Sequence, residues 1–148
     1  MSGRVFVDTN VLAYVFDDAE PEKKVAARRC LDHERRSGEL VVSTQVLQEL
    51  FVCLTRGGAP MASPDVAEQA VMDAAKLTVV QIDVALVLEA IGQSRRSQLS
   101  FWDALIVRAA VAGRCERLLT EDLSHGQVLD GVRVESPFVS TRAGARRR

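Results

Sequence analysis

Short apolar runs alternate with stretches of helical spacing along the chain. The runs predict strands at residues 5–7, 40–42, 79–82, 118–119 and 132–134. Between them, apolar positions three and four apart predict helices at residues 11–16, 21–36, 44–56, 64–76 and 84–93, and a further helix opening at Ser100. Gly38 is expected to end the second helix as a left-handed cap, and Gly57 to end the third.

Strands separated by helices predict an α/β fold, a three-layer α/β/α sandwich with a mostly parallel central sheet. The 148 residues suit a single domain, which we place at residues 1–139. Residues 140–148 read as a disordered basic tail. In parallel sheets of this kind, sites form beyond the carboxyl ends of the strands, so functional residues are expected there and at the starts of the following helices.

Four acidic residues occupy such positions. Asp8 directly follows the first predicted strand, and Glu49 falls in the second turn of the helix after the second strand. Asp103 lies in the first turn of the helix opened by Ser100, and Asp122 follows residues 118–119. We therefore expect the four carboxylates to meet at one edge of the sheet.

Each acid also has an ordinary structural explanation. Asp8 could cap the next helix, Asp103 could belong to a capping box with Ser100, and Asp122 could close an Asx-turn. Glu49 alone is an unexceptional helix residue. The hypothesis rests on all four together, because local capping does not require them at the same edge.

Carboxylates packed together repel one another unless a positive charge lies among them. Mg²⁺ or Mn²⁺ would remove that repulsion and supply an activated water for phosphodiester hydrolysis. The chain has only two histidines, and its three cysteines, Cys30, Cys53 and Cys115, form no CxxC pair. Zinc chemistry is thereby disfavoured, and reduced thiols in or near the core are the favoured interpretation.

Composition is that of a soluble globular protein, with 47% apolar and 26% charged residues. No apolar run reaches the roughly 18 residues that span a bilayer, and no signal peptide is evident, so we expect a cytoplasmic protein that does not bind membranes. Sixteen of the 19 basic residues are arginines, although the net charge is −1. This near-neutral total argues against coating nucleic acid through bulk electrostatics.

Four segments resemble PIN-domain nucleases, especially the VapC-type toxins of toxin–antitoxin pairs. They are residues 5–12 (VFVDTNVL), 43–50 (STQVLQEL), 100–106 (SFWDALI) and 119–123 (LTEDL), in family order. The resemblance implies a metal-dependent endoribonuclease with Asp8, Glu49, Asp103 and Asp122 as catalytic acids. It also implies that Asp8, Asp103 and Asp122 bind Mg²⁺ or Mn²⁺. Asn10 and Thr120 would be supporting polar residues near this site.

The same resemblance implies an RNA substrate, a cognate antitoxin as protein partner, and a homodimer. Residues 44–57 and 64–76 form a predicted helical hairpin whose apolar surplus exceeds one core-facing stripe, which makes it a candidate groove for a partner helix or a dimer contact. The surplus residues are Leu47, Phe51, Leu54, Met61 and Met72.

Two further features stay open at this stage. Trp102 is expected in the core, with stacking on a nucleic-acid base as the alternative. The basic residues of the 21–36 helix, and Arg95 with Arg96, are expected to be solvated, with phosphate binding as the alternative.

Other functions are weighed against the nuclease. Haloacid dehalogenase-type phosphatases need a second acid where this chain has Asn10, and like receiver domains they use a late lysine, whereas the last lysine here is Lys76. The remaining alternative is a catalytically silent PIN-fold binding module. Four retained acids argue against it, because a binding surface has no use for a repulsive cluster.

Overall fold

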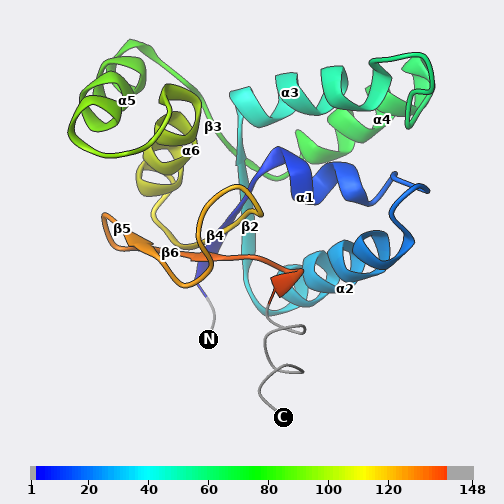
Figure 1. The fold of residues 1–148 in the computed structure, drawn as a ribbon, viewed down its shortest axis with the longest axis horizontal. Coiled ribbons are helices and arrows are strands. Elements are labelled where there is room, and N and C mark those ends of the chain that lie inside the picture. Colours follow the sequence, from blue (N-terminus) through cyan, green and yellow to red (C-terminus); the bar gives the residue numbers. More distant parts are fainter. Residues whose placement is uncertain (1–2, 140–148) are drawn as a thin grey trace.

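The structure, a computed structural model, describes residues 3–139 (Figure 1). The predicted tail at residues 140–148 lies outside the described residues, and the single-domain assignment stays a prediction. The strands are β1 (Arg4–Val7), β2 (Glu39–Ser43), β3 (Thr78–Val80), β4 (Cys115–Leu119), β5 (Val128–Leu129) and β6 (Val132–Glu135). The helices are α1 (Thr9–Tyr14), α2 (Pro21–Ser37), α3 (Thr44–Thr55), α4 (Pro64–Ala74), α5 (Val84–Arg96) and α6 (Phe101–Ala112).

The six strands form one sheet in the order β3-β2-β1-β4-β6-β5. All neighbouring pairs are parallel except β5 and β6, which are antiparallel. The central strand β1 therefore lies between β2 and β4, although Cys115 of β4, the partner of Arg4, follows it by 111 positions in the chain. This order confirms the mostly parallel sheet.

Helices cover both faces of the sheet. Figure 1 shows α2 on one side, next to α1, and α5 and α6 on the other. The main core joins strand residues such as Phe6 and Val41 to Ala27 of α2 and Val107 of α6, all with no exposed surface. The three-layer α/β/α architecture predicted from the sequence is confirmed.

One local prediction was wrong, and one strand was missed. Gly38 ends α2 with extended backbone (φ −164°, ψ −153°) rather than a left-handed cap, because the chain turns directly into β2. Strand β5 was not predicted at all. It pairs with β6 across a tight turn in which Asp130 and Gly131 both have positive φ, 50° and 86°. That conformation favours an Asp-Gly pair, which the sequence does contain.

The α3–α4 hairpin forms as predicted and has a small core of its own. Leu50 and Leu54 of α3 pack there with Ala67 of α4, so Leu54 belongs to the interior rather than to the surface proposed for a partner. Phe51 and Met72 do reach solvent, with exposed fractions of 40% and 53%. The apolar surplus of the hairpin is therefore real but smaller than the sequence predicts.

A hollow lies beside the hairpin, between it and α1 and α2. Leu12, Val15 and Phe16 form one wall, and Leu31 of α2 and Leu77 contribute to the others, enclosing about 460 Å³. Among the described residues, no helix combines the length and apolar character needed to cross a bilayer.

Candidate active site

Asp8 lies at the carboxyl end of β1, between the ends of its two parallel neighbours. Its backbone N–H donates to the carbonyl of Leu119 at 3.0 Å, which holds it against the end of β4. One carboxylate oxygen accepts from the Thr9 N–H at 2.7 Å and so caps α1, and the other accepts from the Thr120 hydroxyl at 2.8 Å. The capping role considered from the sequence is thus real, and it coexists with a place at the sheet edge.

The ionisation of Asp8 is strongly perturbed. The side chain is 6% exposed, and burial raises the pKa of Asp8 to about 7. That value includes the hydrogen bonds from Thr120 and Thr9, which lower the pKa, and the charges of Asp122 and Glu49, which contribute to its rise. A buried carboxyl that shares its surroundings with two other acids has the electrostatic signature of a functional site.

Thr120 connects Asp8 to the Asp122 loop. Its hydroxyl donates to Asp8 and accepts from the Asp122 backbone N–H at 3.0 Å. Asn10 lies beside it, with its side-chain amide 3.4 Å from the Thr120 hydroxyl and its amide oxygen accepting from the Glu121 N–H at 3.4 Å. The turn at Asp122 is therefore closed by a threonine hydroxyl, and not by the Asx-turn considered from the sequence.

Glu49 reaches the same region from α3. Its two carboxylate oxygens accept from the Thr9 hydroxyl at 3.0 Å and from the Gln45 amide at 3.1 Å. Thr9 thus links Glu49 to Asp8, since the same residue donates its backbone N–H to Asp8. The arrangement explains why the charge of Glu49 raises the pKa of Asp8.

Asp103 faces Asp122 from the first turn of α6. Loss of hydration is the largest cause of the raised pKa of Asp122, and the negative charge of Asp103 is the next. The charges of Glu121 and Glu49 make smaller contributions to the rise. Ser100 caps α6, because its hydroxyl accepts a hydrogen bond from the Asp103 N–H at 3.1 Å. This is one of the two hydrogen bonds of the capping box considered from the sequence. The charge of Glu49 therefore acts on both Asp8 and Asp122, and that of Asp103 acts on Asp122.

The donor set suits a hard cation, because it offers only carboxylate, hydroxyl and amide oxygens and its acids repel one another. The ligand geometry is not formed, however. Among residues 3–139, no three His, Cys, Asp or Glu side chains lie close enough to share one metal ion. Asp8 and Glu49 instead direct their oxygens to neighbouring hydroxyl, amide and backbone groups. The assignment of catalytic and metal-binding residues stays a prediction.

Comparison with known proteins decides the family. Residues 5–128, most of the chain, match the PIN domain. The chain belongs to the PIN-domain family. No curated protein matches the sequence at a significant level.

Solved structures share the PIN fold. A toxin–antitoxin complex from Klebsiella pneumoniae superposes with a TM-score of 0.68 at 18% identity, covering 90% of this chain and 98% of that one. DNA-bound VapBC from Salmonella typhimurium gives 0.64 at 20% identity, covering 93% and 99%. VapC20 from Mycobacterium tuberculosis, described as a toxin that cleaves the sarcin–ricin loop, gives 0.57 at 20% identity, covering 77% and 86%. At these identities the likeness shows the fold.

Three residues of this PIN domain next to the acids were missed by the sequence analysis. Glu121 accepts hydrogen bonds from the Tyr14 hydroxyl at 2.6 Å and from the Lys23 ammonium at 3.1 Å. Lys23 also lies 5.0 Å from the centroid of the Tyr14 ring and 5.4 Å from that of Phe138. Position next to Asp122 was the only signal in the sequence that pointed to Glu121.

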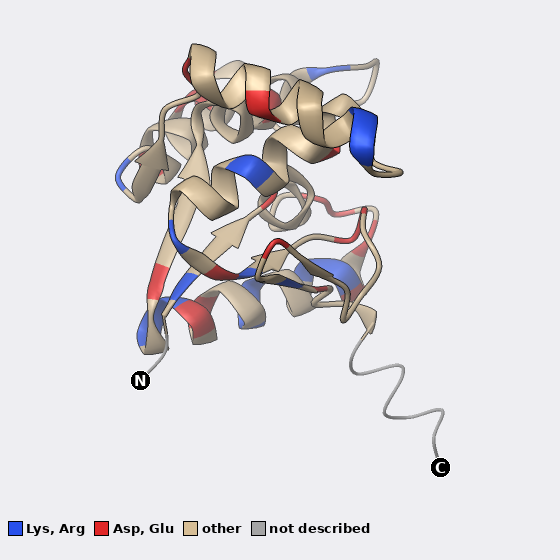
Figure 2. Ribbon diagram, turned by 90° about the vertical axis from the view of Figure 1, so that its left-hand side faces the viewer, with Lys and Arg blue, Asp and Glu red and all other residues tan. Residues whose placement is uncertain are grey.

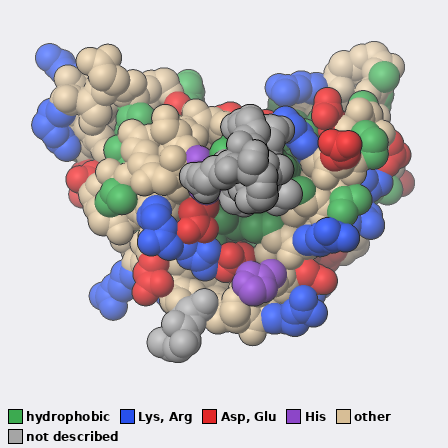
Figure 3. All heavy atoms as spheres, turned by 60° about the horizontal axis from the view of Figure 1, so that its bottom comes forward, with side chains coloured by type: hydrophobic (Ala, Val, Ile, Leu, Met, Phe, Trp, Pro, Cys, Tyr) green, Lys and Arg blue, Asp and Glu red, His purple; other side chains and the backbone are tan. Residues whose placement is uncertain are grey.

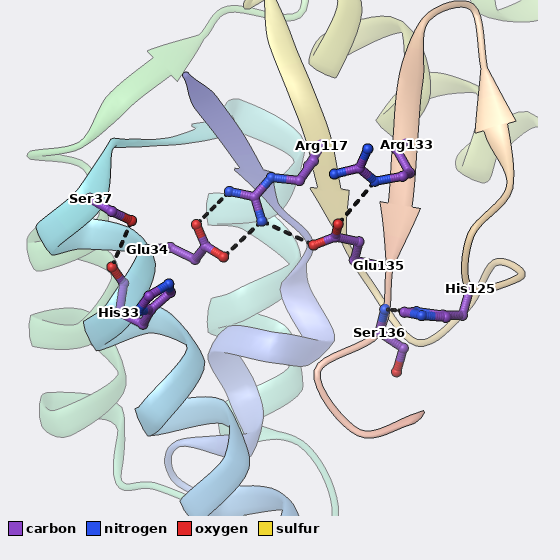
Figure 4. Close-up of polar contacts among 8 residues, drawn as sticks. All are labelled: His33, Glu34, Ser37, Arg117, His125, Arg133, Glu135 and Ser136. Atoms are coloured by element: carbon purple, nitrogen blue, oxygen red, sulfur yellow. Dashed lines mark hydrogen bonds and ion pairs between the residues drawn. The ribbon is translucent and has the colours of Figure 1, made fainter. Parts of the chain in front are cut away.

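Several arginines of the PIN domain form ion pairs with acidic side chains of the same fold. Arg117 of β4 binds Glu34 of α2 at 2.6 Å and Glu135 of β6 at 2.9 Å, and Figure 4 shows its guanidinium held between the two carboxylates. Figure 2 shows basic and acidic positions interleaved along α2, and Figure 3 shows the two signs mixed over the neighbouring face. Neither view shows a broad basic surface, in keeping with the near-neutral net charge.

The cysteines and Trp102 were both expected in or near the core. All three cysteines are free thiols, and burial raises the pKa of Cys30 to about 11 and of Cys115 to about 12. Such thiols are unreactive at neutral pH. The core placement expected for Trp102 was wrong, since 61% of the side chain is exposed.

Proposed function

We propose that this PIN domain is a metal-dependent endoribonuclease that hydrolyses RNA phosphodiesters as the toxin of a type II toxin–antitoxin pair. The observation that carries the proposal is Asp8, a buried acid whose pKa is raised to about 7 among further acids at the carboxyl edge of a PIN-type sheet. A cation beside such a buried carboxyl group would stabilise its ionised form.

Asp8, Asp103 and Asp122 would hold Mg²⁺ or Mn²⁺, and Glu49 is the fourth catalytic acid. The bound ion would lower the pKa of a coordinated water and offset the charge that develops on the phosphate. Small rotations of Asp103 and Asp122, which are less buried than Asp8, would complete the ligand set. A cation between them would offset the mutual repulsion that, after loss of hydration, contributes most to the raised pKa of Asp122.

Asn10 and Thr120 act as supporting residues in this scheme. The Thr120 hydroxyl fixes one oxygen of Asp8 and the backbone of Asp122 at the same time, so two proposed ligands from distant segments keep a set separation. Asn10 holds the intervening Glu121 N–H. The Asp8 carboxylate and the Asp122 backbone are thus held in place before any ion or RNA arrives.

An antitoxin protein and a homodimer are the proposed assemblies. Similar folds occur in the toxin–antitoxin complexes of Klebsiella and Salmonella, which supports an antitoxin partner. The exposed Phe51 and Met72 of the α3–α4 hairpin, and the hollow between α2 and α4, supply apolar surface for such contacts. The compartment we propose is the cytoplasm.

The proposal is tested by incubating the purified protein with total RNA and with Mg²⁺, Mn²⁺ or EDTA, and sequencing the new RNA ends. We expect specific cuts with metal, none with EDTA, and a loss of at least about a hundredfold in Asp8→Asn and Asp122→Asn. Asp65→Asn is the matched control, because Asp65 is an exposed acid in the first turn of α4. Cleavage at full rate in EDTA would refute the metal-dependent mechanism.

The same experiment separates the alternative. A catalytically silent binding module would show no cleavage with any metal while still forming a stable complex with the small protein encoded by the neighbouring gene. Co-purification of the two chains, followed by the cleavage assay on the partner-free protein, distinguishes the two functions.

A further inference from the structure

Trp102 projects from a helix that is otherwise enclosed. The residues of α6 from Ala104 to Val107, together with Ala109 and Ala110, are buried, so the helix has almost no free face beyond its first turn. Phe101 takes the available space beside Ala90 and Leu105. The indole and the Phe101 ring form a T-shaped pair, at 5.0 Å between ring centroids and an interplanar angle of 72°. With 61% of the side chain exposed, an aromatic surface is presented to solvent.

This open indole lies next to the acids. Trp102 directly precedes Asp103, so their Cα atoms are about 3.8 Å apart. Helix α6 ends at Ala112, with two residues between it and β4, and packs against that strand, so its first turn lies toward the carboxyl end of β4, which Asp122 follows. The hydrogen bond from Asp103 N–H to the Ser100 hydroxyl fixes the first turn that carries both side chains. The backbone of Trp102 therefore has a fixed place next to the acidic edge.

Two cations lie close by. Arg95 and Arg96 end α5, and only four residues separate them from the start of α6, against which α5 packs. Both side chains are exposed, and neither forms an ion pair with any residue in the described part of the chain. Arg117 shows the contrast, because its guanidinium is occupied by two carboxylates.

We propose that Trp102 is a stacking platform for one unpaired RNA base beside the cleaved phosphate, with Arg95 and Arg96 binding neighbouring phosphates. The inference rests on the proposed function and deepens it by naming residues outside the acidic cluster that would hold the RNA. Stacking on one exposed aromatic face accepts any base but requires that the base be free of a duplex. The acids alone would repel the phosphate chain, so flanking cations and an uncharged stacking surface supply affinity where the cleavage site cannot.

A contact with a second copy of the chain is the competing use of this surface. The sequence neighbours of Trp102 that reach solvent argue for the base, because Gln98 and Ser100 are polar and exposed and Asp103 is half-buried. The larger apolar exposure of α5, at Val84 and Leu88, belongs to the first two turns of that helix, away from the residues that join α6.

The chain contains one tryptophan, so its intrinsic fluorescence reports on Trp102 alone. The full-length protein in EDTA, where cleavage is not expected, is titrated with a single-stranded oligoadenylate and with an abasic sugar–phosphate strand of equal length. Both probes carry the same charge, but only the first has bases to stack. We expect strong quenching by oligoadenylate and little by the abasic strand.

Binding is followed in parallel by the anisotropy of labelled oligoadenylate. Trp102→Ala should weaken binding about tenfold and Trp102→Phe less, since a phenyl ring retains part of the stacking surface. Arg95→Ala with Arg96→Ala should weaken binding of both strands and reduce its salt dependence. The control is Leu88→Ala, an exposed apolar residue of α5 that should leave affinity unchanged.

Three results would overturn the inference. One is equal quenching by both strands, another is wild-type affinity in Trp102→Ala, and the third is a fluorescence change on dilution of the protein alone, which assigns the indole to a contact between copies. Failure of the proposed function looks different: base-dependent quenching would persist while no metal produced cleavage.

Discussion

The Tyr14 hydroxyl donates a 2.6 Å hydrogen bond to Glu121, the residue directly before Asp122. Through this contact the end of α1 is tied to the loop that carries a proposed metal ligand. Lys23 of α2 binds the other oxygen of the same carboxylate at 3.1 Å. Proximity to Glu121 raises the pKa of Lys23, so the ammonium stays charged at neutral pH.

Removing either donor should loosen the Asp122 loop while leaving the fold intact. We expect Tyr14→Phe to lose about 1 kcal/mol of transition-state stabilisation, roughly a fivefold fall in kcat/KM, and Lys23→Met to lose more because it leaves the Glu121 charge unbalanced beside Asp122. Lys23→Arg should recover most of the activity. Cleavage rates and thermal melts measure both effects, and an equal loss in Arg and Met variants would contradict the positioning role.

Asp8 should couple stability to pH in the absence of metal. Its pKa is raised to about 7, so the folded protein binds this proton more tightly than the unfolded chain. The resulting stabilisation is complete below about pH 4 and is lost as pH rises through about 7. In EDTA at pH 8, Asp8→Asn should therefore be more stable than the wild type by at least about 1 kcal/mol. At pH 4 the difference should vanish.

Saturating Mg²⁺ should shrink or reverse this difference in stability. Ions that bind the ionised acids compete with the proton, so metal affinity should rise with pH up to about 7 and then level off. With saturating Mg²⁺ the wild type gains binding energy that Asp8→Asn lacks. Paired melts in EDTA and Mg²⁺ at pH 4, 6 and 8 give the measurement. A stability difference that ignores both pH and metal would mean that Asp8 is only a helix cap.

The hairpin surface should tolerate charge at one residue and not at its neighbour. Phe51→Glu should leave the fold intact and weaken the antitoxin complex or the dimer, because Phe51 is partly exposed. Leu54→Glu should instead unfold the hairpin, because Leu54 has no exposed surface. Thermal melts, sedimentation and partner pull-down test the pair. An intact complex and an intact dimer in Phe51→Glu would remove this surface from the list of contacts.

Arg117 should matter for stability and not for chemistry. Arg117→Met leaves Glu34 buried without its partner, which costs about 3 kcal/mol or more. The double variant with Glu34→Met should regain much of that loss, because it removes the unpaired charge. Denaturant melts provide the values, and a double variant no more stable than Arg117→Met alone would contradict this account.

The succession of strands and helices along the chain could be predicted from the sequence, because apolar periodicity carries that information. It also indicated that the acids would lie at the carboxyl edge of the sheet. The acids could be located for the same reason: each follows a strand or opens a helix. The β5–β6 hairpin was missed because β5 has only two residues, Val128 and Leu129, too few for a pattern. The following Asp130–Gly131 pair was the available signal, since its two positive φ angles are those of a tight hairpin turn.

Side-chain environments were harder to predict, because they depend on packing between distant segments. Trp102 sits in an apolar helix, yet Phe101 fills the adjoining space and leaves the indole outside. Phe51 and Leu54 are three residues apart in the same apolar pattern of α3. Leu54 faces the hairpin core, whereas Phe51 reaches solvent. The contacts of Glu121 with Tyr14 and Lys23 join residues 98 and 107 positions apart, which no local pattern encodes.

The pairing of β1 with β4 has a consequence during protein synthesis. Asp8 meets Thr120 only after the ribosome has made a further 112 residues of the chain. A nascent chain that stops earlier carries Asp8 and Glu49 but lacks Asp122 and the hydroxyl that holds Asp8. Under the proposed function, such a shortened chain would leave the RNA around the ribosome uncut, because its site is not yet assembled.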